Sequence, residues 1–179
     1  VLTPGDIGSI GIAFIALQSL ESFSKLGLNN ALISKANNLD DYVNEAWVLS
    51  IFRGVLLSSI LFLFSSEIAQ VLGDNNASPF IFYIALTPLI KGFENPYLSE
   101  LKYKLEFRKI SFYNIVRGLS LNLSVIVLIL FIKNIWAIVI ALIISEILSL
   151  LSSFLLIKKY TNLIVKVSNL LIIFHYSKW

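Results

Sequence analysis

Long apolar segments alternate with short polar ones along the whole chain. Five segments each hold about 20 mainly apolar residues, the length that a helix needs to cross a bilayer; they are residues 7–33, 46–66, 79–101, 110–132 and 135–157. A sixth apolar segment begins near Leu171. None of them shows the two-residue alternation of a barrel strand. The pattern therefore predicts an all-α fold, a polytopic bundle of transmembrane helices.

The basic residues of the polar segments lie mostly on one side of the predicted membrane. The segments after the first, third and fifth spans carry Lys35, Lys102, Lys104, Arg108, Lys109, Lys158, Lys159 and Lys166, whereas the opposite side carries only Lys133. An excess of Lys and Arg marks the cytoplasmic side. We therefore expect a multi-pass protein of the cell inner (plasma) membrane, with residues 1–6 and 67–78 outside. Since the chain then enters from outside, an odd number of spans is expected before Val1.

The composition excludes a soluble domain and gives no sign of catalysis. Hydrophobic residues make up 57% of the 179 residues, compared with about 45–50% in soluble domains. The sequence has no Cys and no P-loop, nucleophile elbow or metal-ligand cluster, so we predict no enzyme activity, cofactor or metal. The basic run at residues 102–109 lies between two spans, which favours anionic membrane lipids over nucleic acid as its partner.

Seven ionisable residues inside the predicted spans are candidates for lining a cavity. An ionisable side chain at the bilayer centre costs about 2.5–3.5 kcal/mol on insertion scales, so it usually faces a bundle interior or a water-filled path. The seven are Glu21, Lys25, Arg53, Lys91, Glu94, Arg117 and Glu146. Four are basic and three are acidic. A cavity lined by all of them would suit an anionic group such as a pyrophosphate better than a cationic drug.

Some of these residues also have purely structural interpretations. Glu21 and Lys25 lie four residues apart on one helix face, where they can neutralise each other. Lys91 and Glu94 lie three residues apart and can form an ion pair in the same way. In either case the two charges would neutralise each other and would serve only to hold the helices together.

The other three ionisable residues, Arg53, Arg117 and Glu146, lie at different depths in their predicted spans. Arg53 and Arg117 lie near the cytoplasmic ends of their spans and can extend their side chains to the interface. Glu146 lies at the middle of its span with no basic residue close to it in sequence. It therefore needs a partner from another helix or from a water-filled cavity. Ser149 and Ser153 follow it in one polar stripe, which can also serve helix packing.

Prolines and polar stretches predict where the bundle is interrupted. Pro88 and Pro96 each remove a backbone hydrogen bond from the third span, so kinks are expected there. Broken helices at mid-membrane are typical of transporters. Residues 158–170 are too polar to span; they form either a helix on the cytoplasmic surface or an ordinary connector.

Seven stretches of the sequence together carry a resemblance to a known family. They are LTPGDIG (2–8), FSKLGLNNALI (23–33), NEAWVLSIFRG (44–54), LTPLIKGFENP (86–96), LEFRK (105–109), NIWAIVIA (134–141) and FHYSKW (174–179). In this order they resemble the polysaccharide or O-antigen-type flippases of lipid-linked oligosaccharides, within the multidrug/oligosaccharidyl-lipid/polysaccharide exporter superfamily. The chain departs from that family at Lys25, where an acidic residue is common.

The resemblance implies a two-lobed transporter with alternating access. Residues 1–157 would form a partial N-terminal lobe, residues 158–170 a cytoplasmic linker and residues 171–179 the start of the second lobe. The implied substrate is a polyprenyl-pyrophosphate-linked oligosaccharide, flipped to the outer leaflet for polysaccharide biosynthesis such as lipopolysaccharide synthesis or exopolysaccharide export. Polysaccharide polymerase or glycosyltransferase machinery is a further candidate partner.

Two alternatives stay open on the sequence alone. A drug/cation antiporter of the same superfamily would have a net acidic cavity. A non-transporting membrane scaffold subunit would have all its intramembrane charges paired off, with no central cavity.

Overall fold

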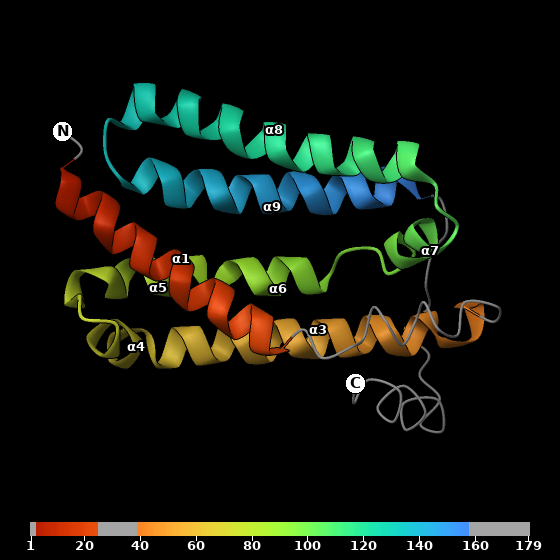
Figure 1. Cartoon of the computed structure of the whole chain (residues 1–179), viewed down its shortest axis with the longest axis horizontal. Helices are drawn as coiled ribbons and strands as arrows, with labels where there is room; N and C mark the ends of the chain where they lie inside the picture. Colours follow the sequence, from red (N-terminus) through yellow and green to blue (C-terminus); the bar gives the residue numbers. More distant parts are fainter. Residues whose placement is uncertain (1–2, 25–38, 158–179) are drawn as a thin grey trace.

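The protein is a bundle of helices that run roughly along one axis (Figure 1). A computed structural model describes residues 3–24 and 39–157, and in these ranges it contains no strand. Four helices are long and apolar enough to cross a membrane: α1 (Pro4–Ser24), α3 (Leu39–Leu63), α8 (Phe107–Ile132) and α9 (Trp136–Leu156). The predicted all-α transmembrane bundle is therefore confirmed.

The helices are arranged around the short pair α5 (Ser78–Ile84) and α6 (Leu86–Gly92). Figure 1 shows α8 and α9 side by side as an antiparallel hairpin, with α5 and α6 end to end between this hairpin and α3. Helix α1 crosses over α5 and approaches α3. Helix α6 thus contacts both α3 and α9, and its side chains can reach the interior from the centre of the bundle.

Two apolar clusters close the two ends of the bundle. The larger cluster joins the first part of α1, the end of α3 and the start of α9, with Leu61 and Ile84 among its fully buried members. The smaller cluster, Val43, Tyr97, Leu101 and Ile157, lies where α3 begins and α9 ends. The charged residues of the spans lie between these clusters, so the polar interior is confined to one layer of the bundle.

The third predicted span, residues 79–101, is broken into α5, α6 and α7 (Leu98–Tyr103). Pro88 has no N–H to donate to the carbonyl of Ile84, and the helix is interrupted at Ala85. The hydroxyl of Ser58 donates a 2.7 Å hydrogen bond to the carbonyl of Ala85. A second break precedes Pro96, since α6 ends at Gly92. The interruption at Ala85 is confined to one residue that keeps helical dihedral angles, with φ of −55° and ψ of −20°, as expected for a kink. Before Pro96, in contrast, the helix ends completely, and α7 begins only at Leu98.

We expect Ser58→Ala to destabilise the full-length protein by about 1 kcal/mol, because the carbonyl of Ala85 then loses its side-chain donor in a buried site. The measurement is the midpoint of thermal unfolding in nanodiscs. Ser59→Ala is the matched control, since Ser59 is exposed and bonds only the carbonyl of Val55 in its own helix. Equal midpoints for the two variants would contradict this role of Ser58.

Two segments predicted as polar loops are largely helical. Helix α3 begins at Leu39, in the polar segment before the predicted span 46–66, and the predicted outer segment 67–78 contains most of α4 (Ser65–Val71) and the short 3-10 helix η2 (Asn75–Ala77). The carboxylate of Asp74 caps η2 by accepting from the N–H of Asn76, and it also accepts a 2.5 Å hydrogen bond from the Ser9 hydroxyl of α1. The sequences of α4 and η2 contain mostly polar residues, with Ala69 and Ala77 buried in the larger cluster, so hydropathy alone does not predict these short helices.

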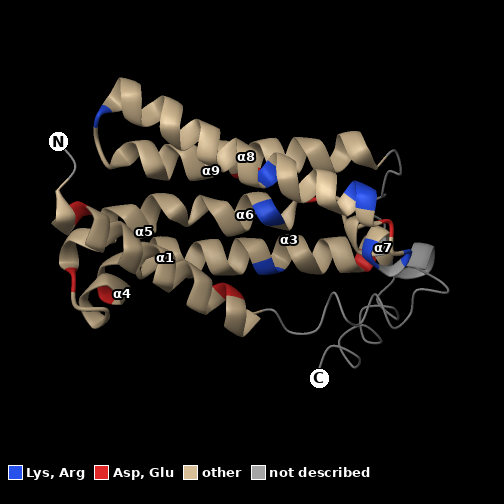
Figure 2. Cartoon of the chain, turned by 45° about the horizontal axis from the view of Figure 1, so that its top comes forward, with Lys and Arg blue, Asp and Glu red and all other residues tan. Residues whose placement is uncertain are grey.

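The charges at the two ends of the bundle follow the predicted asymmetry. Figure 2 shows Lys and Arg gathered around α7 and the start of α8, and Asp and Glu near the start of α1 and around α4. Among the described residues, the first group includes Lys102, Lys104, Arg108 and Lys109, while Lys133 lies at the opposite end. The orientation relative to the cytoplasm stays a prediction. Residues 158–170 and 171–179 lie outside the described residues.

Candidate functional site

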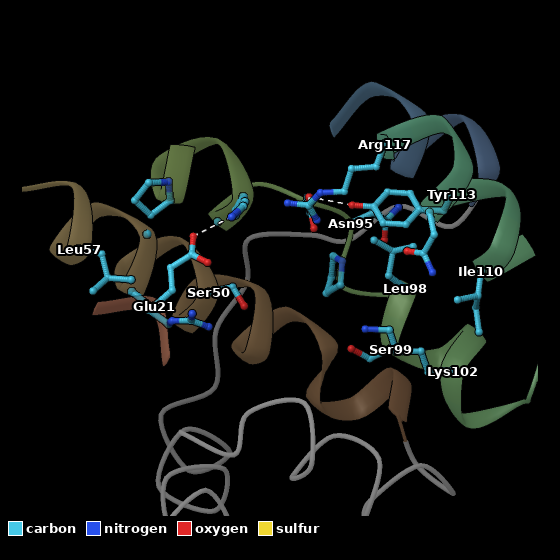
Figure 3. A pocket seen from close by; sticks show the side chains of 18 residues that line it. Glu21, Ser50, Leu57, Asn95, Leu98, Ser99, Lys102, Ile110, Tyr113 and Arg117 are labelled. Carbon is cyan, nitrogen blue, oxygen red and sulfur yellow. Dashed lines mark hydrogen bonds and ion pairs between the residues drawn. The ribbon is translucent and has the colours of Figure 1, made fainter. Parts of the chain in front are cut away.

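A cavity of about 590 Å³ opens within the polar layer, between α1, α3, α6, α7 and α8 (Figure 3). Its charged lining consists of Glu21, Arg53, Lys91, Glu94, Lys102 and Arg117. Its uncharged polar lining includes Ser50, Asn95, Ser99, Tyr113 and Asn114. The cavity thus collects charged side chains from helices that are far apart in sequence.

Lys91 joins α6 to two other helices through carboxylates. Its Nζ lies 2.7 Å from Oε1 of Glu21 on α1 and 3.6 Å from Oε1 of Glu146 on α9. A Lys between two carboxylates is held electrostatically from both sides, which fixes the position of its helix in the bundle.

Arg117 extends this set of charges to α8. Its Nη2 donates to both carboxylate oxygens of Glu146, at 2.9 and 2.8 Å, and its Nη1 lies 3.8 Å from Oε1 of Glu94. The hydroxyl of Tyr113, one turn before Arg117 on the same face of α8, donates a 2.8 Å hydrogen bond to Glu94. Glu21, Lys91, Glu146, Arg117 and Glu94 therefore form one continuous chain of charges, which we call the ion network.

Glu146 is the centre of the ion network and its most buried side chain. Only 5% of the Glu146 side chain is exposed, against 26% for Lys91 and 34% for Arg117. Of the two possibilities predicted for Glu146, a partner from another helix or a water-filled cavity, the structure shows the first, with Lys91 and Arg117 as partners. Ser149 and Ser153 of the same stripe are also buried in the bundle. Glu146 is not among the residues that line the cavity, whereas Lys91 and Arg117 are.

Three structural interpretations from the sequence are corrected. Lys91 forms no ion pair with Glu94, because α6 ends at Gly92 and Glu94 leaves the helix face that carries Lys91. Arg117 does not extend to the interface, since both its ion pairs lie inside the bundle. Arg53 also faces the cavity, and its Nε donates a 2.9 Å hydrogen bond to the hydroxyl of Ser24.

The predicted pairing of Glu21 with Lys25 cannot be compared, because Lys25 lies outside the described residues. Glu21 instead has Lys91 as its partner. Within residues 3–24 and 39–157, no group of three His, Cys, Asp or Glu side chains is close enough to hold a metal ion.

The sequence pattern did not assign Lys102 and Tyr113 to the cavity. The sequence pattern places Lys102 in a polar segment between two spans. In the structure, the break before Pro96 lets α7 turn back, so that Lys102 lines the cavity. The hydropathy pattern does not predict that a helix turns back toward the cavity in this way. Tyr113 does carry a signal, since it lies four residues before Arg117 and therefore on the same helix face.

The cavity lining is basic on balance. Four basic side chains line it and two acidic ones do so, because Glu146 is not among the lining residues. Both lining carboxylates already have partners in the ion network. Among the described residues, Arg53 and Lys102 have no carboxylate within ion-pair distance, and these two cations are therefore available to an anion that enters the cavity.

A close contact between α3 and α6 forms the wall beside Arg53 and Lys91. A Cβ atom on Gly54 would lie 2.5 Å from the carbonyl oxygen of Pro88, and one on Gly92 would lie 2.9 Å from that of Ser50. Glycine at both positions lets the two backbones touch. Because Arg53 and Lys91 each precede one of these glycines, the contact places both cations at the same wall.

Comparison with known proteins agrees with this membrane architecture. A family model described as polysaccharide biosynthesis protein matches residues 1–179. The chain belongs to this family of polysaccharide biosynthesis proteins. It is also 26% identical over 128 residues to a membrane protein of the cps region of Klebsiella pneumoniae, an alignment that covers 70% of this chain and 26% of that protein. No solved structure matches the chain significantly.

The family match confirms the resemblance at the level of polysaccharide biosynthesis. Together with the four helices that can span a membrane, it identifies the chain as a multi-pass membrane protein of that process. The aligned chain spans about a quarter of the length of the Klebsiella relative.

Proposed function

We propose that this polysaccharide biosynthesis protein takes part in moving a polyprenyl-pyrophosphate-linked oligosaccharide from the cytoplasmic to the outer leaflet. The observation that carries the proposal is a basic cavity between helices of the bundle, of which α1, α3 and α8 can span a membrane. A protein of polysaccharide biosynthesis that must transfer sugars across a bilayer needs a polar compartment of this kind, because the hydrocarbon core offers sugars and phosphates no hydrogen bonds.

The lining matches the chemistry of such a head group. A pyrophosphate is a multivalent anion, and Arg and Lys bind phosphate oxygens through charge-assisted hydrogen bonds. Asn114 adds a polar group at the same cavity, and a side-chain amide can bond sugar hydroxyls. In the proposed complex the lipid tail stays in the bilayer while the head group occupies the cavity.

The basic residues divide into two roles in this proposal. Lys91 and Arg117 are engaged by the carboxylates of the ion network and build the wall. Arg53 and Lys102 are the cations that meet the pyrophosphate, since neither has a described carboxylate within ion-pair distance. This division refines the expectation that all the basic residues of the cavity would together suit an anionic group.

The balance of the lining disfavours the alternative of a drug/cation antiporter. A cationic substrate would need lining carboxylates without partners, whereas Glu21 and Glu94 are both engaged. The scaffold alternative is disfavoured by the cavity, because Lys91 and Arg117 stay partly exposed within it.

The test uses the full-length protein in proteoliposomes with a fluorescent, short-chain polyprenyl-pyrophosphate disaccharide. We expect the double variant R53Q/K102Q to lower the rate of transfer between leaflets by about tenfold or more, since each lost charge-assisted hydrogen bond is worth about 1.5–3 kcal/mol. Transfer is read from the loss of fluorescence accessible to an impermeant quencher.

The matched control is K133Q, which removes a basic residue at the opposite end of the bundle. Its transfer rate should equal that of the unmodified protein. Transfer by R53Q/K102Q at the unmodified rate would refute the assigned roles of these two cations. Absence of transfer by the unmodified protein, at normal folding and insertion, would refute the proposed function itself.

A further inference from the structure

A second basic surface lies outside the cavity, at the turn between α7 and α8. Residues 102–109 carry four basic residues and one acidic residue. Lys102 faces the cavity, whereas Lys104, Arg108 and Lys109 do not line it and are exposed. These three basic residues, with Leu105 and Phe107 between them, are called the α7–α8 turn below.

The backbone of the α7–α8 turn presents two large apolar side chains beside its basic ones. Leu105 adopts a left-handed conformation with φ of 53°, which is uncommon for a residue other than glycine. Hydrogen bonds from the N–H of Glu106 to the carbonyl of Leu101, at 3.0 Å, and from that of Phe107 to Leu105, at 2.7 Å, fix this geometry. As a result the side chains of Leu105 and Phe107 are 63% and 66% exposed.

The position of the turn along α8 sets the surroundings of these side chains. Helix α8 is 26 residues long and begins at Phe107, so the turn lies where a membrane-spanning helix leaves the apolar layer. Phe112 and Ile115 continue the exposed apolar surface along the first turns of α8. An exposed apolar surface that runs from the turn into a spanning helix suits the acyl chains of lipids better than water.

Basic side chains next to the end of a spanning helix can reach the lipid phosphates. Long Lys and Arg side chains cover apolar surface with their methylene groups and extend their charges to the head groups. Lys109 keeps a 2.6 Å ion pair with Glu106, which is exposed and so partly offsets the charge of Lys109 without burying it. Clusters of basic residues next to a spanning helix bind anionic lipids. A soluble anion would explain the basic residues but not the exposed Leu105 and Phe107.

We propose that the α7–α8 turn binds anionic phospholipids, with Lys104, Arg108 and Lys109 at the phosphates and Leu105 and Phe107 among the upper acyl chains. This site is separate from the cavity and does not depend on what the cavity transports. Its ligand is the head group of a membrane lipid at the surface and not a translocated molecule.

The test compares lipid retention by the full-length protein and by its triple variant K104Q/R108Q/K109Q. Each is purified from mixed micelles of phosphatidylglycerol and phosphatidylcholine, and bound lipid is counted by native mass spectrometry. We expect the triple variant to retain phosphatidylglycerol at least about tenfold less, given about fivefold for each basic side chain near the surface. Retention of phosphatidylcholine should not change.

Two controls separate this outcome from misfolding and from general charge effects. K133Q removes a basic residue at the other end of α8 and should retain phosphatidylglycerol normally. Should the triple variant not fold, R108Q and the charge-preserving R108K replace it, with reduced retention expected only for R108Q. Equal retention by the basic-to-Gln variants and the unmodified protein would overturn the proposal. So would complete displacement of the lipid by equimolar inorganic pyrophosphate, because the site would then bind a free anion.

Discussion

Replacing Glu146 by alanine should destabilise the full-length protein by about 3 kcal/mol. The change removes the shared partner of Lys91 and Arg117, a carboxylate that is itself only 5% exposed, and leaves two neighbouring cations without their common counter-charge. Removing one partner of a buried ion pair lowers the free energy of unfolding by about 3–5 kcal/mol. The lower end applies here because both cations stay partly exposed and Glu21 and Glu94 still neutralise them. The measurement is the midpoint of thermal unfolding in nanodiscs.

A double-mutant cycle distinguishes charge pairing from loss of packing. R117Q/E146Q removes both charges of the closest pair, and it should be more stable than the sum of its single variants predicts. The double variant E106A/K109A is the control, since that ion pair is exposed and worth only about 0–1 kcal/mol. Additive effects of R117Q and E146Q would show that the ion network does not couple these residues.

The transmembrane bundle could be predicted from the sequence because a helix needs a fixed number of apolar residues to cross the bilayer. A run of about 20 apolar residues has few alternatives to a membrane helix, and α8 and α9 agree with the predicted spans to within three residues at either end. The need of Glu146 for a partner was predictable for a similar reason. A buried carboxylate at mid-membrane is too costly to stay alone, whichever residue provides the charge.

The identity of its partners could not be predicted in the same way. Lys91 is 70 residues from Glu21 and 55 from Glu146 along the chain, and nothing local in the sequence encodes which helices become neighbours. The pairing of Lys91 with Glu94 was wrong because it assumed an unbroken helix. Pro88 and Pro96 signalled interruption, but the direction in which α7 turns, and hence the place of Lys102, depends on packing against α8.

The role of the glycines between α3 and α6 could not be predicted from the sequence either. Gly54 and Gly92 were visible in the sequence, but only their contact in space shows that each makes room for the other helix. Gly118 looks similar in the sequence and has no neighbouring atom within 4 Å of where a Cβ would lie. Sequence position alone therefore could not tell a required glycine from a tolerated one.

This difference between the glycines leads to the second large effect that we expect. Gly54→Ala should destabilise the protein by about 3 kcal/mol, the upper end for overpacking, because its Cβ would meet the backbone oxygen of Pro88 at 2.5 Å. Backbone atoms cannot turn aside as a flexible side chain can, so α3 and α6 must separate. The separation would move Lys91 relative to its partners on α1 and α9. Transfer of the pyrophosphate-linked probe should therefore fall as well.

Gly118→Ala provides the matched control in the same bundle. It adds the same methyl group to a helix, at a position with open space, and alanine has the higher helix propensity by about 1 kcal/mol. Its unfolding midpoint should equal or slightly exceed that of the unmodified protein. Gly92→Ala should behave like Gly54→Ala, since its Cβ would meet the carbonyl oxygen of Ser50 at 2.9 Å. If all three variants unfold at the same temperature, α3 and α6 do not touch through their backbones, and the cavity wall that places Arg53 beside Lys91 has another origin.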